Sequence, residues 1–138
     1  MRSRAHYSVV VCESHPGHAD AVAGQLLEYG YDVRRCADEL ALIETSVASR
    51  PRAIVYELHH DLPVDLAVLS LVRRVLPHIP LVVVAGALAE HAIRVLRAID
   101  PTVLEHEPVD RAELIAAMRR AMRRSRISER RERALAAV

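Results

Sequence analysis

The sequence predicts a single α/β domain in which a five-stranded parallel sheet lies between two layers of helices. Three observations predict this fold. The 138 residues are 51% hydrophobic, which allows one domain with a sizeable core. Short β-branched runs alternate with stretches of helical periodicity. The alternation repeats five times at spacings of about 20–25 residues, which is typical of strand–helix units in a parallel sheet covered on both faces.

Each predicted strand is followed by a predicted helix. We expect strands at 7–12, 31–35, 53–56 and 79–86, and a short strand with its loop at 102–110. We expect helices at 16–30, 38–49, 66–76, 88–99 and from 110 to about 134. The second strand alternates apolar and charged residues, which favours an edge position, whereas the fourth is the most apolar and is therefore expected to be central.

The helix limits are marked by residues with known capping preferences. Pro16 fits the first turn of a helix, and Gly30 fits the position after a helix end. Asp38 is a suitable N-cap for the second helix, and Asp110 with Glu113 has the spacing of a capping box at the start of the last. Apolar residues share one face of the second and third helices: Leu40, Ile43 and Val47, then Leu66, Leu69, Val72 and Val75.

The composition excludes several kinds of protein. Phe and Trp are absent, so Val, Leu, Ile and Ala must fill the core. All 19 basic residues are Arg, which excludes a Schiff-base or phosphate-loop lysine. Cys12 and Cys36 are too few for a disulfide framework. No run of about 18 apolar residues predicts a membrane span, and no signal peptide is recognised, so we expect a cytoplasmic protein.

Charge is distributed unevenly along the chain. From Arg119 to Arg133, eight arginines are accompanied only by Glu129 and Glu132, a local net charge of +6. The other residues contain eleven arginines and sixteen acids, a net charge of −5. We therefore divide the chain into a domain at 1–122 and an Arg-rich helical C-terminal extension at 123–138.

Candidate functional residues follow four of the predicted strands, at the ends where ligands bind in parallel sheets. They are Cys12 with Glu13, Glu57, Ala85 with Gly86, and His106 with Glu107. The turn after the first strand, ESHPGH, contains a single Gly. A dinucleotide-binding fingerprint is therefore absent.

Five stretches together resemble the receiver domain of bacterial response regulators. They are GYDVRRCAD after the first helix, RPRAIVYEL at the third strand, IPLVVVAG at the fourth, AIRVLRAID in the fourth helix and EPVDRAELIAAMRRAM at the end. The resemblance covers about residues 7–122 and rests on the order and spacing of these stretches. It implies a three-layer, flavodoxin-like, receiver-like fold with an extended last helix.

In that family the crevice holds a metal-binding acidic pair, a phosphate-accepting aspartate, a Thr or Ser, and a Lys. The resemblance places these roles on Cys12 and Glu13, on Glu57, on Ala85 and on Glu107. Cys12 removes an oxygen ligand of magnesium, and Ala85 cannot hydrogen-bond a phosphoryl group. Glu107 would repel that group. Glu57 is one methylene longer than Asp, a displacement of roughly an ångström that costs about a hundredfold in rate.

We therefore expect a pseudo-receiver, with a degenerate phosphoacceptor pocket and no catalytic residue, bound metal or cofactor. Two interpretations of Glu57 are open: it mimics a phosphorylated aspartate, or it is an ordinary carboxylate bonded to solvent or to a loop amide. The resemblance places the aromatic switch position of the fifth strand on Leu104. Because no ring is present there to swing inward, Leu104 disfavours the mimic.

A zinc-type set of ligand residues also approaches the crevice, although no pair has strong ligand spacing, and surface histidines are the alternative. The set is Cys12, Glu13, His15, Glu57, His59, His60, His106 and Glu107. Cys12 is expected to be a buried packing residue and not a redox sensor, because neighbouring acids raise the pKa of a thiol.

The Arg-rich extension has three interpretations. It is a solvated helix end, a binding site for an acidic partner, a membrane surface or nucleic acid, or an amphipathic segment that pairs with a second copy. Its basic residues are Arg123, Arg124, Arg126, Arg130, Arg131 and Arg133. No aromatic residue lies nearby to stack bases, so single-stranded nucleic acid is the least favoured partner.

Three functions are open. The first is an adaptor or regulatory module for protein partners, including a second copy in a homodimer. The resemblance implies that its docking face is formed by the fourth helix, the fifth strand and the fifth helix, with Arg94, Arg97, Asp100, Glu113, Arg119 and Arg120. The second is the receiver part of a transcription regulator whose tail leads to or recruits a DNA-binding output. The third, a metal-dependent hydrolase, lacks any nucleophile–base spacing.

Overall fold

The computed structural model describes residues 7–12, 16–58, 62–86, 88–105 and 109–137. Within them, the strands are β1 (Ser8–Cys12), β2 (Asp32–Cys36), β3 (Ala53–Glu57), β4 (Leu81–Ala85) and β5 (Thr102–Glu105). The helices are α1 (Pro16–Tyr29), α2 (Glu39–Ser49), α3 (Leu62–Val75), α4 (Glu90–Ile99) and α5 (Arg111–Ala136). Strands and helices alternate in the predicted order.

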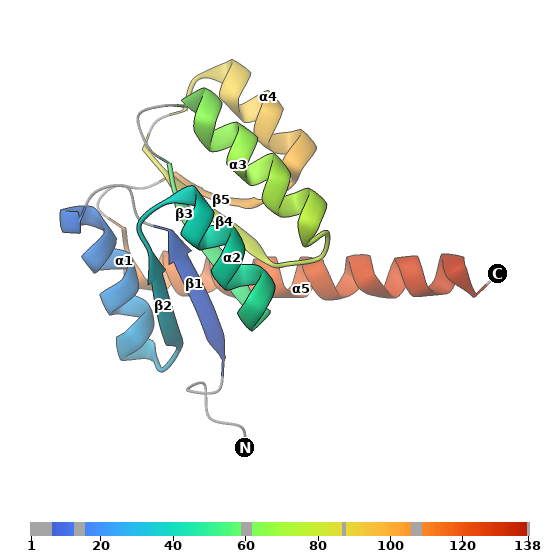
Figure 1. Cartoon of the computed structure of the whole chain (residues 1–138), viewed down its shortest axis with the longest axis horizontal. Coiled ribbons are helices and arrows are strands. Elements are labelled where there is room, and N and C mark those ends of the chain that lie inside the picture. Colours follow the sequence, from blue (N-terminus) through green and yellow to red (C-terminus); the bar gives the residue numbers. More distant parts are fainter. Residues whose placement is uncertain (1–6, 13–15, 59–61, 87, 106–108, 138) are drawn as a thin grey trace.

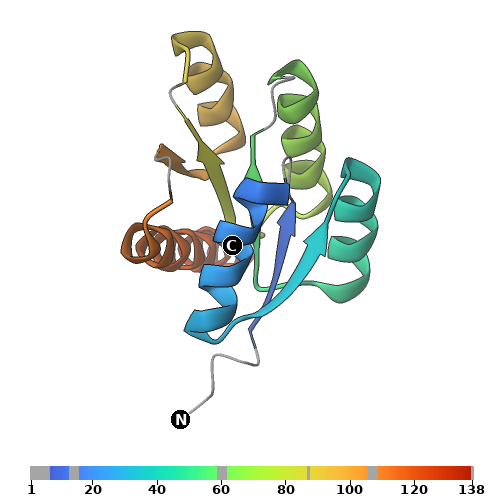
Figure 2. The ribbon, with the colours of Figure 1, turned by 90° about the vertical axis from the view of Figure 1, so that its left-hand side faces the viewer.

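The strands form one parallel sheet in the order β2-β1-β3-β4-β5. Helices α1 and α5 cover one face of this sheet, and α2, α3 and α4 cover the other (Figures 1 and 2). The predicted three-layer fold is therefore confirmed. β2 has the predicted edge position. β4 is an interior strand, but the middle position belongs to β3.

The two faces of the sheet form two separate cores. Val9 and Val11 of β1 pack with Leu26 of α1 and with Leu114 and Met118 of α5. The residues between and after them in β1 turn to the opposite face, as the two-residue period of a strand requires. That second core contains Val10, Cys12, Ile54, Leu69 and Leu96. Both cores are aliphatic for the most part, as the absence of Phe and Trp predicts.

The predicted helix caps are present. One Asp38 carboxylate oxygen accepts a hydrogen bond from the Ala41 amide at 2.8 Å. At the start of α5, Asp110 accepts one from the Glu113 amide at 3.1 Å. Gly30 follows the end of α1 with a φ of 112°, a value that glycine adopts without strain. These local signals were therefore sufficient to place three of the helix ends.

The buried side of α2 differs from the predicted apolar face. Leu42 and Ser46 are buried, whereas Leu40 and Val47 are 68% and 47% exposed. The rotation of the helix is fixed at its start, where the Asp38 cap holds the first turn and the Cys36 thiol donates to the Ala41 carbonyl at 3.6 Å. These contacts with the end of β2 decide which side packs on the sheet, and apolar spacing alone did not predict them.

Helix α3 begins about one turn earlier than predicted, at Leu62. Pro63 lies in its first turn, where a missing backbone N–H leaves no helical hydrogen bond unmade. The buried residues of α3 are Asp65, Leu69 and Val72. Leu69 and Val72 belong to the predicted face, but Val75 is 43% exposed.

Helix α5 is uninterrupted over 26 residues, a length of about 39 Å. Its first half packs on the sheet, with buried residues from Leu114 to Ala121. Its second half projects beyond the sheet, and the chain end lies at its tip (Figure 1). The Arg124 guanidinium fastens the helix where it leaves the sheet, by donating to the Asp100 carboxylate and to the Pro101 carbonyl.

Replacing the α2 cap tests this account of local stability. Asp38→Ala leaves the Ala41 amide without its acceptor and should lower the free energy of unfolding by about 1 kcal/mol. Urea denaturation followed by circular dichroism measures the change. Asp32→Ala removes the same charge from an exposed position at the start of β2 and should alter stability by less than about 0.5 kcal/mol. Equal losses in the two variants would contradict the assignment of Asp38 as a cap.

Candidate functional site

The carboxyl ends of β1, β3 and β4 meet at one edge of the sheet, as predicted. Cys12 ends β1, Glu57 ends β3 and Ala85 ends β4. Register pairs Cys12 with Tyr56, and Glu57 with Val84. The chain order of neighbouring strands reverses between β1 and β3, which is the place where open parallel sheets bind ligands. We refer to this edge as the crevice.

The Cys12 side chain lies beneath the crevice, in the core under α2 and α3. It is fully buried, and Cys36 lies beside it in the same register on β2. Burial raises the pKa of the Cys12 thiol to about 12, with smaller contributions from Cys36 and the acids Glu39 and Asp65. The thiol is therefore neutral at physiological pH. It cannot supply the anionic oxygen that a magnesium ion requires.

A buried polar pair supports the floor of the crevice. The Tyr56 hydroxyl donates to a carboxylate oxygen of Asp65 at 2.7 Å, and both residues are fully buried. Burial and this hydrogen bond raise the pKa of Tyr56. Sequence reasoning missed Asp65, although an acid in the first turn of a helix after Pro63 is a recognisable signal. The pair connects β3 to α3 and has no opening to solvent.

The other described positions of the predicted phosphoacceptor pocket are Glu57, Ala85 and Leu104, and two of these three have no polar side-chain group. Glu57 is 6% exposed at the end of β3. Ala85 is 3% exposed and offers only a methyl group. Leu104, on which the resemblance places the switch position of the fifth strand, is 7% exposed and packs in the core with α1 and α5. A packed aliphatic side chain at this position has no polar group with which to report the state of the crevice.

Several predicted residues lie outside the described ranges. They are Glu13, His15, His59, His60, His106 and Glu107. Among the residues that the structure describes, no three His, Cys, Asp or Glu side chains are grouped so that they could hold a metal ion. None of the helices within those ranges combines the length and apolar character that crossing a membrane requires.

The predicted docking face contains a groove of about 410 Å³ between α4, β5 and α5. Arg97, Asp100 and Arg120 line it. Arg94 lies on the exposed side of α4, 3.2 Å from Glu90. The lining also contains the apolar residues Leu88, Ile93, Leu96, Pro101 and Val103, and the polar residues Thr102, Glu105 and Arg124.

Two of the six predicted face residues lie elsewhere on α5. Glu113 is in its exposed first turn. Arg119 donates to the Tyr29 hydroxyl on α1, and its guanidinium is 5.9 Å from the centre of that ring. Because consecutive helix residues are rotated by about 100°, Arg119 and Arg120 are directed to different sides of α5. Arg119 therefore does not belong to the α4–β5–α5 face.

The basic residues of the extension also differ in their surroundings. Arg124 is bound to the α4–β5 turn and lines the groove of the docking face. Arg123 and Arg126 line another groove, on a different side of α5. The remaining three, Arg130, Arg131 and Arg133, are exposed on the projecting half of the helix.

No protein-family model and no curated protein sequence matches the chain. Solved structures do match. NtrX from Brucella abortus, in complex with ADP, has a TM-score of 0.77 at 22% identity, over 92% of this chain and 28% of that chain. CheY4, a chemotaxis response regulator of Vibrio cholerae, has a TM-score of 0.71 at 15% identity, over 83% and 98%. The signal receiver domain of a modulated diguanylate cyclase from Desulfovibrio desulfuricans has 0.75 at 15%, over 88% and 97%.

These similarities establish the fold. The chain has the flavodoxin-like fold of CheY-like receiver domains, which confirms the resemblance on which the sequence prediction rests. The chain spans 28% of the length of the NtrX chain but 98% of that of CheY4. The likeness therefore concerns one domain of the larger protein.

The buried Cys12 thiol makes stability depend on pH in the alkaline range. Its pKa is about 12 in the folded chain, against 9.0 for an exposed thiol. Between these values the unfolded chain loses a proton that the folded chain keeps, so stability should fall as the pH rises from about 9 to about 12. Urea denaturation at successive pH values measures the slope. Cys12→Ala should reduce it without abolishing it, since Tyr56 acts in the same direction. An unchanged slope in Cys12→Ala would contradict the shift.

Proposed function

We propose that the chain is a receiver-like signalling module that acts through protein–protein contacts and does not depend on phosphorylation. One observation supports this most strongly: the strand end that supplies a metal-binding carboxylate in receivers has Cys12, a neutral thiol buried beneath the crevice. The module is expected to be cytoplasmic, without a cofactor, and not an enzyme.

The residues that replace the receiver residues at the crevice all disfavour the same reaction, phosphoryl transfer. Phosphoryl transfer depends on positioning and on charge stabilisation by a metal and by donors. Ala85 has no donor, and Cys12 is no magnesium ligand at neutral pH. In the sequence, Glu107 replaces a lysine with an anion. Glu57 alone keeps a carboxylate at the acceptor position, with a longer side chain.

Phosphorylation can be tested directly. Incubation with acetyl phosphate and magnesium should leave the intact mass of the chain unchanged, because neither the metal nor the phosphoryl group is held. A receiver domain already shown to gain one phosphoryl group under these conditions, treated in parallel, is the positive control for the reagent. A stoichiometric gain of one phosphoryl group on this chain would overturn phosphorylation independence. Beryllofluoride gives a second measurement, since saturable amide shifts near Cys12, Glu57 and Ala85 would have the same meaning.

The face of α4, β5 and α5 is the proposed docking surface, with a second copy of the chain as its partner. Its groove combines apolar residues with both signs of charge: Arg97, Arg120 and Arg124 line it with Asp100 and Glu105, and Arg124 is bonded to Asp100 within the chain. In a two-fold dimer the same surface meets itself, so a face with both signs can place arginines of one copy opposite acids of the other.

Self-association on this face should depend on salt. Sedimentation velocity should show a dimer at about 50 mM salt and mainly monomer at about 500 mM, because added salt screens exposed charges. Arg120→Glu should weaken the dimer at low salt by about tenfold. Arg34→Glu, an equal charge change on β2 at the other edge of the sheet, should leave it unaltered. A monomeric mass at every concentration in low salt would contradict self-pairing.

A second candidate function is the receiver part of a transcription regulator. The projection of α5 beyond the sheet favours it, because a helix in this position can lead to or recruit an output domain (Figure 1). The first function is preferred, since the crevice and the α4–β5–α5 face account for it without a further domain.

A further inference from the structure

A large groove opens at the amino end of the sheet, opposite the crevice. Its volume is about 760 Å³. Tyr7, Arg52 and Pro80 line it, and these residues immediately precede β1, β3 and β4. The ends of α2 and α3 and one side of α5 complete its walls. We call it the basal groove, and its position makes it independent of the phosphoacceptor pocket.

The basal groove has an apolar floor. Val47, Val75, Leu76, Ile79 and Met122 line it, from three helices and the α3–β4 loop. Val47 and Val75 are 47% and 43% exposed. Apolar side chains gathered in a concave surface mark a binding site, whereas single exposed ones are normal. Val47, on the side of α2 that does not pack on the sheet, thus forms part of the floor of this groove.

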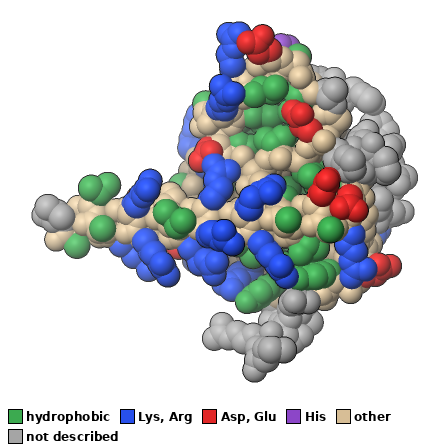
Figure 3. Space-filling model, turned by 180° about the vertical axis from the view of Figure 1, so that it is seen from behind, with side chains coloured by type: hydrophobic (Ala, Val, Ile, Leu, Met, Phe, Trp, Pro, Cys, Tyr) green, Lys and Arg blue, Asp and Glu red, His purple; other side chains and the backbone are tan. Residues whose placement is uncertain are grey.

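The rim of the basal groove is strongly basic. Among the lining residues, five arginines are accompanied by one acid. They are Arg50, Arg52, Arg119, Arg123 and Arg126, with Glu129 as the acid. Their formal charge is therefore +4. Within the described part of the chain, Arg123 and Arg126 have no ion pair. Figure 3 shows the molecule from behind, where arginines gather along α5 and beneath it, beside hydrophobic side chains.

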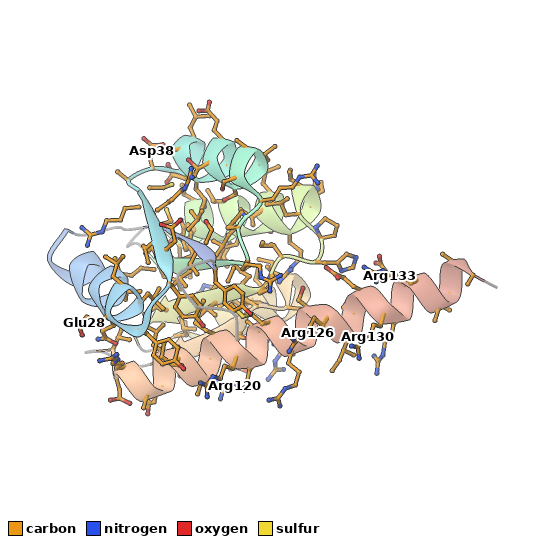
Figure 4. The ribbon with its side chains drawn as sticks, turned by 90° about the horizontal axis from the view of Figure 1, so that it is seen from below. Glu28, Asp38, Arg120, Arg126, Arg130 and Arg133 are labelled. Carbon is orange, nitrogen blue, oxygen red and sulfur yellow. The ribbon has the colours of Figure 1, made fainter. Side chains whose placement is uncertain are left out.

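The basic rim continues along α5 as a stripe. Arginines recur at alternating spacings of four and three residues, which places them on one side of the helix over about 21 Å. We define the arginine stripe as Arg119, Arg123, Arg126, Arg130 and Arg133. The last three follow one another along the projecting half of the helix (Figure 4).

Apart from Arg119, which donates to the Tyr29 hydroxyl, the arginine stripe adds little to the stability of the fold. Like charges three and four residues apart destabilise a helix. In the described structure, Glu129 forms an ion pair with only one of them, Arg133, at 3.8 Å, and such a pair at the surface contributes little. A row of cations that opposes helix formation and borders an apolar groove is therefore explained by a ligand rather than by stability.

The adjacent side of α5 is fixed to the body of the domain. The Ser125 hydroxyl donates to the His78 carbonyl, and the His78 ring lies 2.6 Å from a carboxylate oxygen of Glu132. Arg124 adds its bonds to the α4–β5 turn. These contacts hold α5 against the α3–β4 loop, so the basal groove and the arginine stripe keep a fixed relation to each other.

We infer that the basal groove and the arginine stripe bind an acidic amphipathic helix of a partner protein. Apolar residues on one face of that helix enter the floor, as in helix-in-groove recognition. Asp or Glu residues on the flank of that helix, spaced alternately by three and four positions, match the spacing of the arginines and pair with them. Charged residues that flank the contact between paired helices interact in the same way. The inference goes beyond the proposed function, because it names a partner class at a surface that neither the crevice nor the α4–β5–α5 face shares.

The other possible occupants fit less well. A second copy would bring its own arginine stripe against this one if the pairing were two-fold. Residues 1–6 contain Arg2 and Arg4 and no acid. A nucleic acid would match the arginines but would leave the apolar floor uncovered. Tyr7, the one aromatic residue of the lining, already has the Arg52 guanidinium 4.6 Å from its ring centre.

A designed peptide tests the inference on the full chain. The probe is a fluorescein-labelled helical peptide with Leu on one face and Glu on both flanks, and the matched probe has Gln in place of every Glu. Fluorescence anisotropy should show saturable binding of the Glu peptide, weakening at least tenfold between about 50 and about 500 mM salt. The Gln peptide should bind at least tenfold more weakly. Equal binding of the two peptides, or none, would overturn the inference.

Variants of the chain separate the charge from the apolar floor. Arg123→Glu with Arg126→Glu should reduce affinity for the Glu peptide at least tenfold, whereas Arg34→Glu with Arg131→Glu, an equal change outside the groove, should not. Val75→Asp tests the floor and should also reduce affinity. Circular dichroism verifies that each variant is folded. If Val75→Asp binds normally, or if a labelled duplex DNA or phosphatidylserine vesicles compete for the stripe more tightly than the peptide, the proposed partner class is wrong.

The two sets of experiments fail separately. Loss of peptide binding would leave the acetyl phosphate result and the dimer measurement unchanged, because these concern the crevice and the α4–β5–α5 face. Phosphorylation of the chain would likewise leave the basal groove intact. A negative result can therefore be assigned to one proposal.

Discussion

The rest of the structure depends on the burial of β1, β3 and β4 on both faces. Their side chains leave almost no surface to water, so helices must cover the sheet above and below. Parallel strands then require a helix in each connection, and all their carboxyl ends come to one edge. This constraint explains why Cys12, Glu57 and Ala85 meet, although nothing in their chemistry requires it.

The same constraint decides what Cys12 is. A residue at the end of β1 in this register points into the core under α2 and α3, where a small neutral side chain packs well. An ionised carboxylate would have to be paired there or remain near the solvent edge. The polar groups described around Cys12 already have hydrogen-bond partners: the Cys36 thiol donates to the Ala41 carbonyl, and the Tyr56 hydroxyl donates to Asp65. The end of β1 thus has a packing role.

Local signals in the sequence predicted much of the fold, because they act over a few residues. Asp38, Asp110 and Gly30 fixed helix ends, and the β-branched runs fixed the strands. The directions in which helix side chains point were predicted wrongly at two places. Leu40 was predicted on the packed face of α2 but is exposed. Arg119 was predicted on the same face as Arg120 but points to α1. Such orientations depend on contacts between elements distant in the sequence, which spacing alone does not encode.

The crevice was partly predictable for the same reason. The topology of a parallel sheet gathers strand ends, so Cys12, Glu57 and Ala85 could be placed together from their positions alone. The buried partnership of Tyr56 with Asp65 could not, because it joins a strand to the first turn of the following helix. The basal groove was also beyond prediction, since its walls come from α2, α3 and α5 and exist only once these helices are packed.

The attachments of Arg124 to Asp100 and of Glu132 to the His78 ring make α5 a brace between the α4–β5 turn and the α3–β4 loop. The two attachments are about 12 Å apart along the helix axis. A tilt of about 10° at the α4–β5 turn would therefore move Glu132 by about 2 Å, enough to break its 2.6 Å contact with His78. A rearrangement of α4 that tilts the helix thus has to release the α3–β4 loop as well.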